Sequence, residues 1–400
     1  MSPGWRVSIY SQDSLGLGHL RRNILVAGSL VEAAPEPRVL MFADSPVAPF
    51  FKVPDRMDHV KLPSIRKVTA GCWEATRLGI DEGDLLQMRQ DMLRDALLDF
   101  RPDLVLVDHM PAGARGELLP ALDALKNAHP DSRIVLGVRD VLDTPEVVLR
   151  VWERDGAYDA LRRYYDQILV YGSSQVFDAH RAYDLPTLTH GAHYCGYVVK
   201  RGPVEDAARI RRAIGLDTPR HVFVGAGGGG DGQALMRTYV RAIGILGPNV
   251  GFGSLMAVGA NAPPELLAEL EADARGLPVR VVPYVEHSRS HMAAADLVVC
   301  MGGYNTLSEV LYLKKRALVV PRAGPSEEQR IRAGLFAARN LIDVLDPGDL
   351  TPESLAERLA RDLERTDYPP DDEVVPMHGA AQAAGHLLEL LRDGARVAGA

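Results

Sequence analysis

Short apolar runs alternate with helical patterns along almost the whole of this 400-residue chain. In the helical patterns, apolar residues recur every three or four positions. Such alternation is typical of βα units, in which parallel strands lie buried beneath helices. We therefore expect an α/β protein with doubly wound parallel sheets, rather than an all-helical or all-strand chain.

The sequence pattern of the first half of the chain predicts five main strands and four helices. The strands are Arg6–Ser11, Arg38–Ala43, Leu104–Asp108, Arg133–Val138 and Gln167–Gly172, and the helices are His19–Ala34, Gly83–Phe100, Gly116–Ala128 and Gly156–Tyr165. The stretch Phe50–Gly79 contains Pro54, Pro63 and Gly71, so it predicts a long loop with one short strand, His59–Leu62.

The second half restarts the alternation after a segment crowded with histidine and glycine, Pro186–Gly202. The strands are His221–Gly225, Gly251–Met256, Val279–Pro283, Asp296–Cys300, Arg316–Pro321 and Leu341–Val344, and the helices are Val204–Ile214, Gln233–Ile245, Pro264–Ala274, Thr306–Leu313, Glu327–Arg339 and Pro352–Arg365. We expect two Rossmann-like domains, residues 1–200 and 201–376, facing a cleft. A last helix, Gly379–Arg392, falls in residues 377–400.

Composition narrows the class of protein. A hydrophobic fraction of 46% is typical of globular domains, and a net charge of −8 without a long basic run argues against nucleic-acid binding. Cys72, Cys195 and Cys300 lie far apart, which disfavours disulfides and a structural zinc site. No signal peptide or long apolar span is visible, so the expected location is the cytoplasm, with peripheral membrane contact left open.

Two loops of the first half hold candidates for catalysis. His19 follows the first strand and opens a helix, where the positive end of the helix dipole favours a neutral imidazole that can accept a proton. The alternative is that the His19 side chain points into solvent and has no catalytic role. Asp108 ends a buried strand and could orient that imidazole or cap the next turn. Arg139, at another strand end, could contact an acceptor or form an ion pair with Asp140.

Three loops of the second half could bind an anion. The run from Gly225 to Gly232 leaves backbone N–H groups unshielded but lacks the Lys-Ser/Thr of a P-loop. In the turn Met301–Glu309, Asn305 or Thr306 could cap a helix whose N-terminus suits a diphosphate. Glu309 could then bind a sugar hydroxyl or complete a capping box. The third loop, Pro321–Gln329, again precedes a helix.

Taken in order, these loops resemble GT-B glycosyltransferases, and the second half resembles the MurG-type, family 28-like enzymes. The resemblance covers about residues 6–365. It is carried by the stretches Gly16–Arg22, Val138–Glu146, Arg162–Gly172, Gly302–Glu309 and Glu327–Arg332. It implies the GT-B fold, with two Rossmann-like domains and a C-terminal helix that crosses back to the first.

The resemblance also implies roles for individual residues. His19 would be the general base, with Gly18 and Arg139 on the acceptor side. Glu309 would bind the ribose and Glu328 and Gln329 the donor sugar. The donor diphosphate would contact Gly227, Gly228, Gly229, Gly302, Gly303, Tyr304, Asn305 and Thr306. Because Arg21-Arg22 replaces a proline of MurG-type enzymes, and residues 45–115 do not match the lipid-binding surface of MurG, we expect a different acceptor.

The implied activity is an inverting transfer of a sugar from a nucleotide diphosphate donor to a hydroxyl or amine. The expected donor is UDP-linked, with N-acetylglucosamine as the candidate sugar, and neither a cofactor nor a metal ion is expected. The partners would be this donor and a sugar, lipid or small-molecule acceptor. Two alternatives stay open: a UDP-hexosamine epimerase of the same fold, and a non-catalytic protein that binds sugar nucleotides.

Overall fold

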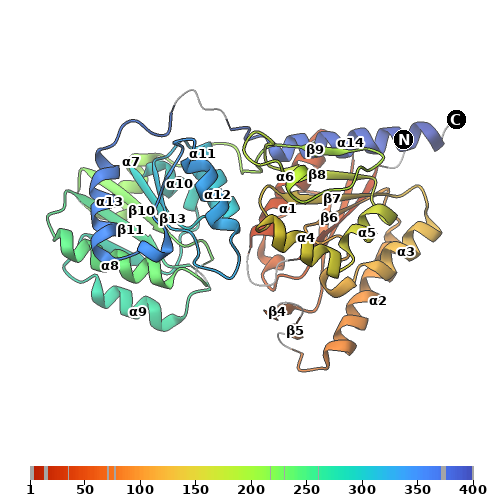
Figure 1. The fold of residues 1–400 in the computed structure, drawn as a ribbon, viewed down its shortest axis with the longest axis horizontal. Coiled ribbons are helices and arrows are strands. Elements are labelled where there is room, and N and C mark those ends of the chain that lie inside the picture. Colours follow the sequence, from red (N-terminus) through yellow and green to blue (C-terminus); the bar gives the residue numbers. More distant parts are fainter. Residues whose placement is uncertain are drawn as a thin grey trace. The chain divides into compact units, whose positions relative to one another are not determined.

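The computed structural model describes residues 4–12, 17–34, 36–69, 72–75, 78–216, 218–228, 230–259, 261–370 and 375–398. The chain forms two compact units. Unit 1 consists of Met1–Val199 together with Pro376–Ala400, and unit 2 consists of Lys200–Val375. Unit 2 is therefore inserted in the sequence of unit 1. Figure 1 labels the elements of both units.

Unit 1 is built on a parallel sheet of seven strands in the order β3-β2-β1-β6-β7-β8-β9. Its strands are β1 (Arg6–Ser11), β2 (Arg38–Ala43), β3 (Met57–Lys61), β6 (Leu104–Asp108), β7 (Arg133–Arg139), β8 (Gln167–Tyr171) and β9 (Ala192–Tyr194). Its helices are α1 (Gly18–Ala33), α2 (Glu82–Phe100), α3 (Leu119–Ala128), α4 (Pro145–Arg154), α5 (Ala157–Tyr164), α6 (Ala179–Ala182) and α14 (Gly379–Ala398), with short 3-10 turns at Ala48–Phe50 and Ala114–Gly116.

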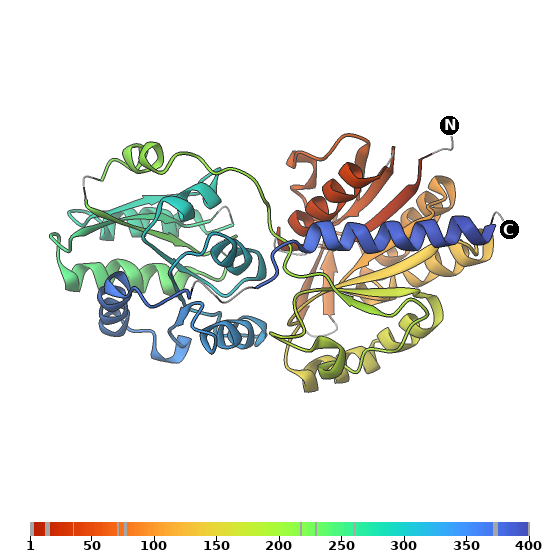
Figure 2. The same ribbon diagram turned by 90° about the horizontal axis from the view of Figure 1, so that it is seen from above.

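Apolar strand residues are the main reason that this sheet is buried. Every residue of β6, Leu-Val-Leu-Val-Asp, and every residue of β8 is buried, as expected for strands covered by helices on both faces. The strand residues form a core cluster with α2, α3 and α5. Helix α14 packs along α1 and also contacts β7 (Figure 2). The last helix thus completes unit 1, which confirms that it returns to the first domain.

Unit 2 repeats this plan with six parallel strands in the order β12-β11-β10-β13-β14-β15. They are β10 (Arg220–Gly225), β11 (Phe252–Ala257), β12 (Val279–Val282), β13 (Leu297–Cys300), β14 (Ala317–Val319) and β15 (Asp343–Val344). The helices are α7 (Ala207–Ile214), α8 (Gln233–Leu246), α9 (Pro264–Asp273), α10 (Ser288–Ala294), α11 (Tyr304–Tyr312), α12 (Glu328–Ala337) and α13 (Pro352–Glu364).

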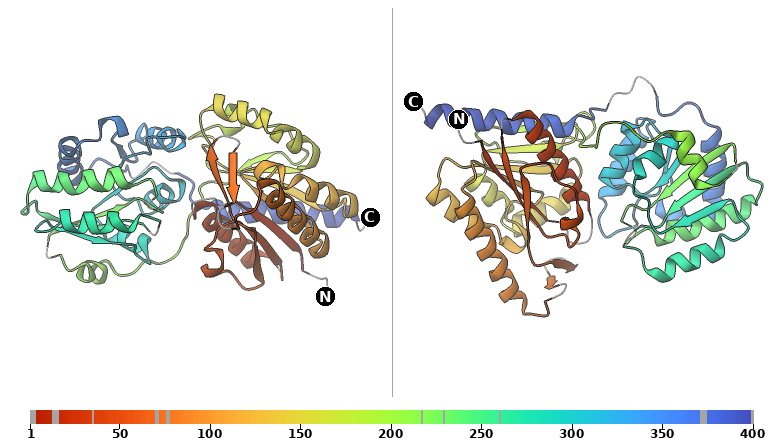
Figure 3. Two further views of the ribbon diagram at one scale, coloured as in Figure 1. Left: turned by 90° about the horizontal axis from the view of Figure 1, so that it is seen from below. Right: turned by 180° about the vertical axis from the view of Figure 1, so that it is seen from behind.

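The prediction of a long loop over Phe50–Gly79 is wrong in part. The predicted strand His59–Leu62 is present as β3, but the same stretch also contains an antiparallel pair, β4 (Ile65–Thr69) and β5 (Cys72–Ala75). Figure 3 shows this pair in orange as a small sheet of its own. Valine, isoleucine, threonine and tryptophan favour strands, and this preference outweighs the nearby proline and glycine. Helices α4, α6 and α10 were not predicted either.

Candidate active site

In both sheets the order in which the chain adds strands reverses between two neighbouring strands. In unit 1 the order reverses at β1 and β6, and in unit 2 at β10 and β13. Ligands of open parallel sheets bind at such switch points, beyond the carboxyl ends of the strands. The segments that follow these four strands begin at Gln12, His109, Ala226 and Met301, and they include most of the predicted site residues.

In unit 1, His19 and Asp108 lie in direct contact at the switch point. Nδ1 of His19, the second residue of α1, is 2.7 Å from Oδ2 of Asp108, the last residue of β6. Asp108 is fully buried, whereas 19% of the His19 side chain is exposed. The predicted pairing of the two residues is thus present, with the imidazole partly open to solvent and the carboxylate closed to it.

Two further residues of α1 hold the Asp108 carboxylate in place. Arg22 Nη2 donates to Oδ1 at 2.6 Å, and Asn23 Nδ2 donates to Oδ2 at 3.1 Å. Burial alone would raise the pKa of Asp108, but the positive charge of Arg22 and the hydrogen bonds from Arg22 and His19 outweigh it and hold this pKa well below its usual range. Asp108 is therefore a fixed anion beneath the imidazole.

A second histidine, His109, lies beside the pair and was not predicted. Its ring centroid is 5.4 Å from that of His19, and its φ of +71° is unusual for a residue other than glycine. Burial, followed by the positive charge of Arg139, lowers the pKa of His109 well below its ordinary value. His109 is therefore neutral at physiological pH and adds no charge that would oppose protonation of His19.

The remaining predicted residues of unit 1 lie at the ends of the same sheet. Gly18 is the first residue of α1, directly before His19. Arg139 is the last residue of β7, the strand next to β6, and is half-buried. Asp140, the next residue, is fully buried.

In unit 2, the turn after β13 brings backbone close to backbone. A Cβ added to Gly302 would lie 2.8 Å from the carbonyl oxygen of Gln329, so only glycine fits there without displacement. Gly303 has open space around it and is the N-cap of α11. The expectation that Asn305 or Thr306 caps this helix is wrong, because α11 begins at Tyr304 and no side chain caps it.

Because α11 starts at Tyr304, Asn305 and Thr306 fall inside its first turn instead of capping it. Backbone N–H groups in the first turn have no partner within the helix. Tyr304 is buried and its ring lies 5.5 Å from the guanidinium carbon of Arg332, a fully buried residue of α12. Arg332 also donates to the carbonyl of Gly302 at 3.3 Å. The anchored turn is therefore rigid, and Glu309 stands within α11, beyond the first turn.

The other two loops of unit 2 lie beside this turn. Gly227 has a φ of +65°, and a Cβ on Gly228 would lie 3.4 Å from Asn261 Nδ2. Gly229 lies outside the described residues. Glu328 and Gln329 are the first residues of α12, and Gln329 Oε1 accepts a hydrogen bond from the backbone N–H of Arg322 at 3.1 Å. Glu328 and Gln329 are both mostly buried.

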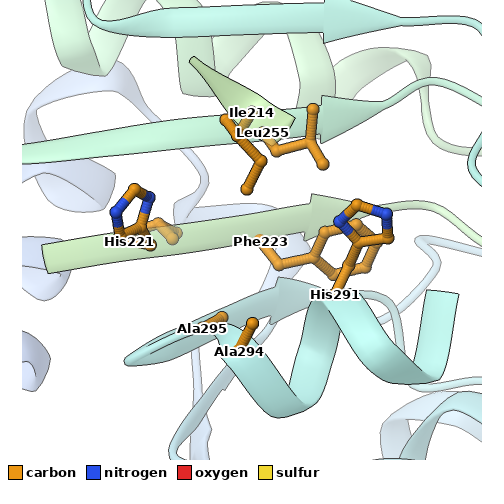
Figure 4. A pocket seen from close by; sticks show the side chains of 8 residues that line it. Ile214, His221, Phe223, Leu255, His291, Ala294 and Ala295 are labelled. Carbon is orange, nitrogen blue, oxygen red and sulfur yellow. The ribbon is translucent and has the colours of Figure 1, made fainter. Parts of the chain in front are cut away.

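A small crevice in unit 2 is separate from these loops (Figure 4). It is lined mainly by apolar side chains of β10, β11, α7 and α10, with the imidazoles of His221 and His291 at its wall. Burial lowers the pKa of both imidazoles. His221 is near the start of β10, at the end of the strand away from the glycine run. This crevice is therefore not part of the candidate site.

Two kinds of feature are absent from the described ranges. No group of three or more histidine, cysteine, aspartate or glutamate side chains is placed to hold a metal ion. No helix within these ranges is long and apolar enough to cross a membrane.

Comparison with known proteins shows the family to which the second unit is related. Residues 251–381 match the glycosyltransferase family 28 C-terminal domain. The chain is 27% identical over 246 residues to the UDP-N-acetylglucosamine–N-acetylmuramyl-(pentapeptide) pyrophosphoryl-undecaprenol N-acetylglucosamine transferase of Burkholderia vietnamiensis. That alignment covers 60% of this chain and 65% of the relative, so the chain spans just under two thirds of it.

Solved structures establish the fold. MurG of Acinetobacter baumannii superimposes with a TM-score of 0.56 at 14% identity, covering 97% of this chain and 99% of that one. This chain has the GT-B fold. A putative UDP-N-acetylglucosamine 2-epimerase from Listeria monocytogenes has the same fold, with a TM-score of 0.64 at 11% identity over 98% of this chain and 96% of that one. The MurG-like fold alone therefore does not decide the reaction.

Proposed function

We propose that this MurG-like protein is a glycosyltransferase that moves a sugar from a nucleoside diphosphate to a hydroxyl or amine acceptor. The observation that carries the proposal is the contact between His19 and the buried Asp108, at the switch point of unit 1. The match of residues 251–381 to the family 28 C-terminal domain supports a nucleotide-sugar donor on unit 2. The named substrate of the Burkholderia relative supports a UDP-linked N-acetylhexosamine.

The chemistry assigns one nitrogen of His19 to each partner. With Nδ1 protonated and donating to Asp108, the other ring nitrogen, Nε2, has a lone pair for the acceptor proton. The acceptor oxygen or nitrogen bonds to the anomeric carbon as its proton passes to Nε2. Asp108 then faces an imidazolium, and its fixed negative charge stabilises that ion, as orienting carboxylates do in catalytic triads.

The leaving group would be held by unit 2. As the bond between the anomeric carbon and the phosphate oxygen breaks, its electron pair goes to the diphosphate. The positive N-terminal end of α11, after Gly302 and Gly303, is suited to this growing charge. Displacement in one step inverts the anomeric centre. Glu309 would bind the ribose, and Glu328 and Gln329 the sugar hydroxyls.

A thermal-shift screen against nucleotide sugars tests this function, because a ligand that binds only the folded state raises the unfolding temperature. We expect stabilisation by at least one UDP-sugar, followed by release of UDP when acceptors are added. Incubation with that UDP-sugar alone should leave it unchanged. Formation of its epimer would instead identify an epimerase, and tight binding without turnover over a broad acceptor panel would identify a binding protein.

A further inference from the structure

Arg322 occupies a position between the donor loops that neither the predicted site nor the proposed reaction uses. It lies in the loop between β14 and α12, and its side chain is 25% exposed. Nη1 of Arg322 donates to Asp231 Oδ2 at 3.0 Å, and Nη2 is 3.7 Å from Glu328 Oε1. Its Nε atom is buried and has no hydrogen-bond partner among the described residues.

These contacts join three loops that are far apart in sequence. Asp231 belongs to the loop after β10, 91 residues before Arg322. Glu328 and Gln329 begin α12, and Gln329 packs against Gly302 of the turn after β13. Because β10, β13 and β14 are neighbours in a parallel sheet, their carboxyl ends meet at one edge. The guanidinium of Arg322 therefore lies where the proposed donor diphosphate would enter.

The two carboxylates that contact Arg322 bind it weakly. Asp231 is 53% exposed, and ion pairs with that much solvent contribute little to stability. Glu328 is 3.7 Å away and is also 3.9 Å from Arg332. A diphosphate carries more charge than one carboxylate, and the planar guanidinium can bind its oxygens with two parallel hydrogen bonds. Exchange of Asp231 for diphosphate is therefore favourable.

We propose that Asp231 holds Arg322 when no donor is bound, and that Arg322 moves its guanidinium to the donor diphosphate when the nucleotide sugar enters. This inference rests on the proposed function. Arg322 would then recognise the diphosphate specifically, so that the protein distinguishes a nucleoside diphosphate from a nucleoside. Asp231 would compete with the ligand for the same cation.

Binding measurements on the full chain separate this role from that of a structural brace. We expect Arg322→Gln to weaken UDP binding about ten-fold or more, because the guanidinium donates charge-assisted hydrogen bonds. Asp231→Asn should leave UDP binding unchanged or make it a few-fold tighter, because the competitor is gone. The double variant should bind UDP as weakly as Arg322→Gln alone. Uridine, titrated by the same calorimetry, should bind all variants equally.

The matched control is Arg330→Gln. Arg330 is an arginine of α12 with two carboxylate partners, Glu327 at 3.3 Å and Asp346 at 3.2 Å. It should leave UDP affinity unchanged. Arg322→Lys keeps the positive charge but loses the planar guanidinium and its parallel hydrogen bonds. Its affinity for UDP should therefore lie between those of wild type and Arg322→Gln. It also provides the measurement if Arg322→Gln does not fold.

Three outcomes would overturn the inference. If Asp231→Asn and Arg322→Gln weaken UDP binding equally, the ion pair acts only by holding the loops in place. If Arg322→Gln binds UDP with wild-type affinity, Arg322 does not contact the diphosphate, and the proposed function is unaffected. If only Arg322→Lys folds, the same conclusion follows when that variant binds both UDP and uridine as wild type does. If wild type binds none of UDP, dTDP and GDP, both the inference and the proposed donor site fail.

Discussion

Nδ1 of His19 lies 2.7 Å from Oδ2 of Asp108, although 89 residues separate them in the chain. They meet because β1 and β6 are parallel neighbours, so that the helix after β1 and the end of β6 share one edge of the sheet. Asp108 cannot turn away from His19, because Arg22 and Asn23 hold its two oxygens. The pair is therefore fixed before any substrate binds.

Replacing His19 by alanine should lower the rate of sugar transfer about 100-fold or more, because general base catalysis contributes factors of that size. Nucleotide binding measured by calorimetry should not change, since the donor is assigned to unit 2. The control is His378→Ala, which removes an exposed histidine of unit 1. A His19→Ala protein that transfers sugar at the wild-type rate would exclude this residue as the base.

Asp108→Asn should destabilise the protein at pH 7, by about 3 kcal/mol, because it leaves the buried Arg22 without its carboxylate. The pKa of Asp108 is lowered by folding, so its stabilising contribution is complete above the unfolded pKa of about 4 and is lost as pH falls further. Urea unfolding should therefore show the two proteins converging below pH 4. A constant difference from pH 7 to pH 3 would contradict this account.

The contribution of Asp44 to folding stability should depend on pH in the opposite way. Burial raises the pKa of its carboxyl to about 7, against a smaller opposing effect of Arg89, whose Nη1 is 4.0 Å from Asp44 Oδ1. Since the folded pKa is raised, this contribution to stability is present below the unfolded pKa of about 4 and is lost as pH rises through 7.

Asp44→Asn should therefore be more stable than wild type at pH 8, on the order of 2–3 kcal/mol, and similar to it at pH 4. Thermal and urea unfolding at the two values measure the difference. Asp58→Asn, in the neighbouring strand, is the control because the Asp58 side chain is 89% exposed. If both variants follow wild type equally at pH 4 and pH 8, Asp44 does not titrate in this way.

Gly302→Ala should weaken UDP binding about ten-fold or more, because the new Cβ would push the turn after β13 away from Gln329. Gly334→Ala, in α12, is the control, since nothing lies within 4 Å of a Cβ there and the residue has no assigned contact with the donor. Calorimetry with UDP on both variants measures the effect. Equal affinities for the two variants would show that the close approach of the turn to α12 does not shape the donor site.

Sugar transfer should continue at full rate in EDTA, because the helix N-terminus and glycine loops are assigned the charge of the leaving diphosphate. The measurement is release of UDP with and without EDTA, with added Mg²⁺ as the control. Loss of activity that Mg²⁺ restores would mean that a cation, rather than the protein's N–H groups, carries this charge.

Strands were easier to predict from the sequence than the residues around the site. A run such as Leu104–Asp108 has a strong apolar pattern, and the structure places β6 at the same residues. His19 and Asp108 were both found because each follows an apolar run at a strand end. Arg22 carries a weaker signal, its spacing of three residues from His19 on one helix face, and its burial depends on the whole sheet.

Other features depend on contacts between distant segments. The start of α11 at Tyr304 rather than at Asn305 or Thr306 follows from packing of Tyr304 and Arg332, which no local pattern contains. The left-handed backbone of His109 is similarly set by its surroundings, because histidine has no intrinsic need for it. The pairing of Arg322 with Asp231 joins loops 91 residues apart. Such details require the folded chain.

The packing of α14 on α1 determines the order in which the chain can acquire structure. Unit 2 lies entirely between residues 200 and 375, so its whole sequence is synthesised before the last helix of unit 1. During synthesis, the α1 face that receives α14 stays uncovered until α14 has been made. A chain that stops before α14 would therefore carry the complete sequence of unit 2 beside an unfinished unit 1.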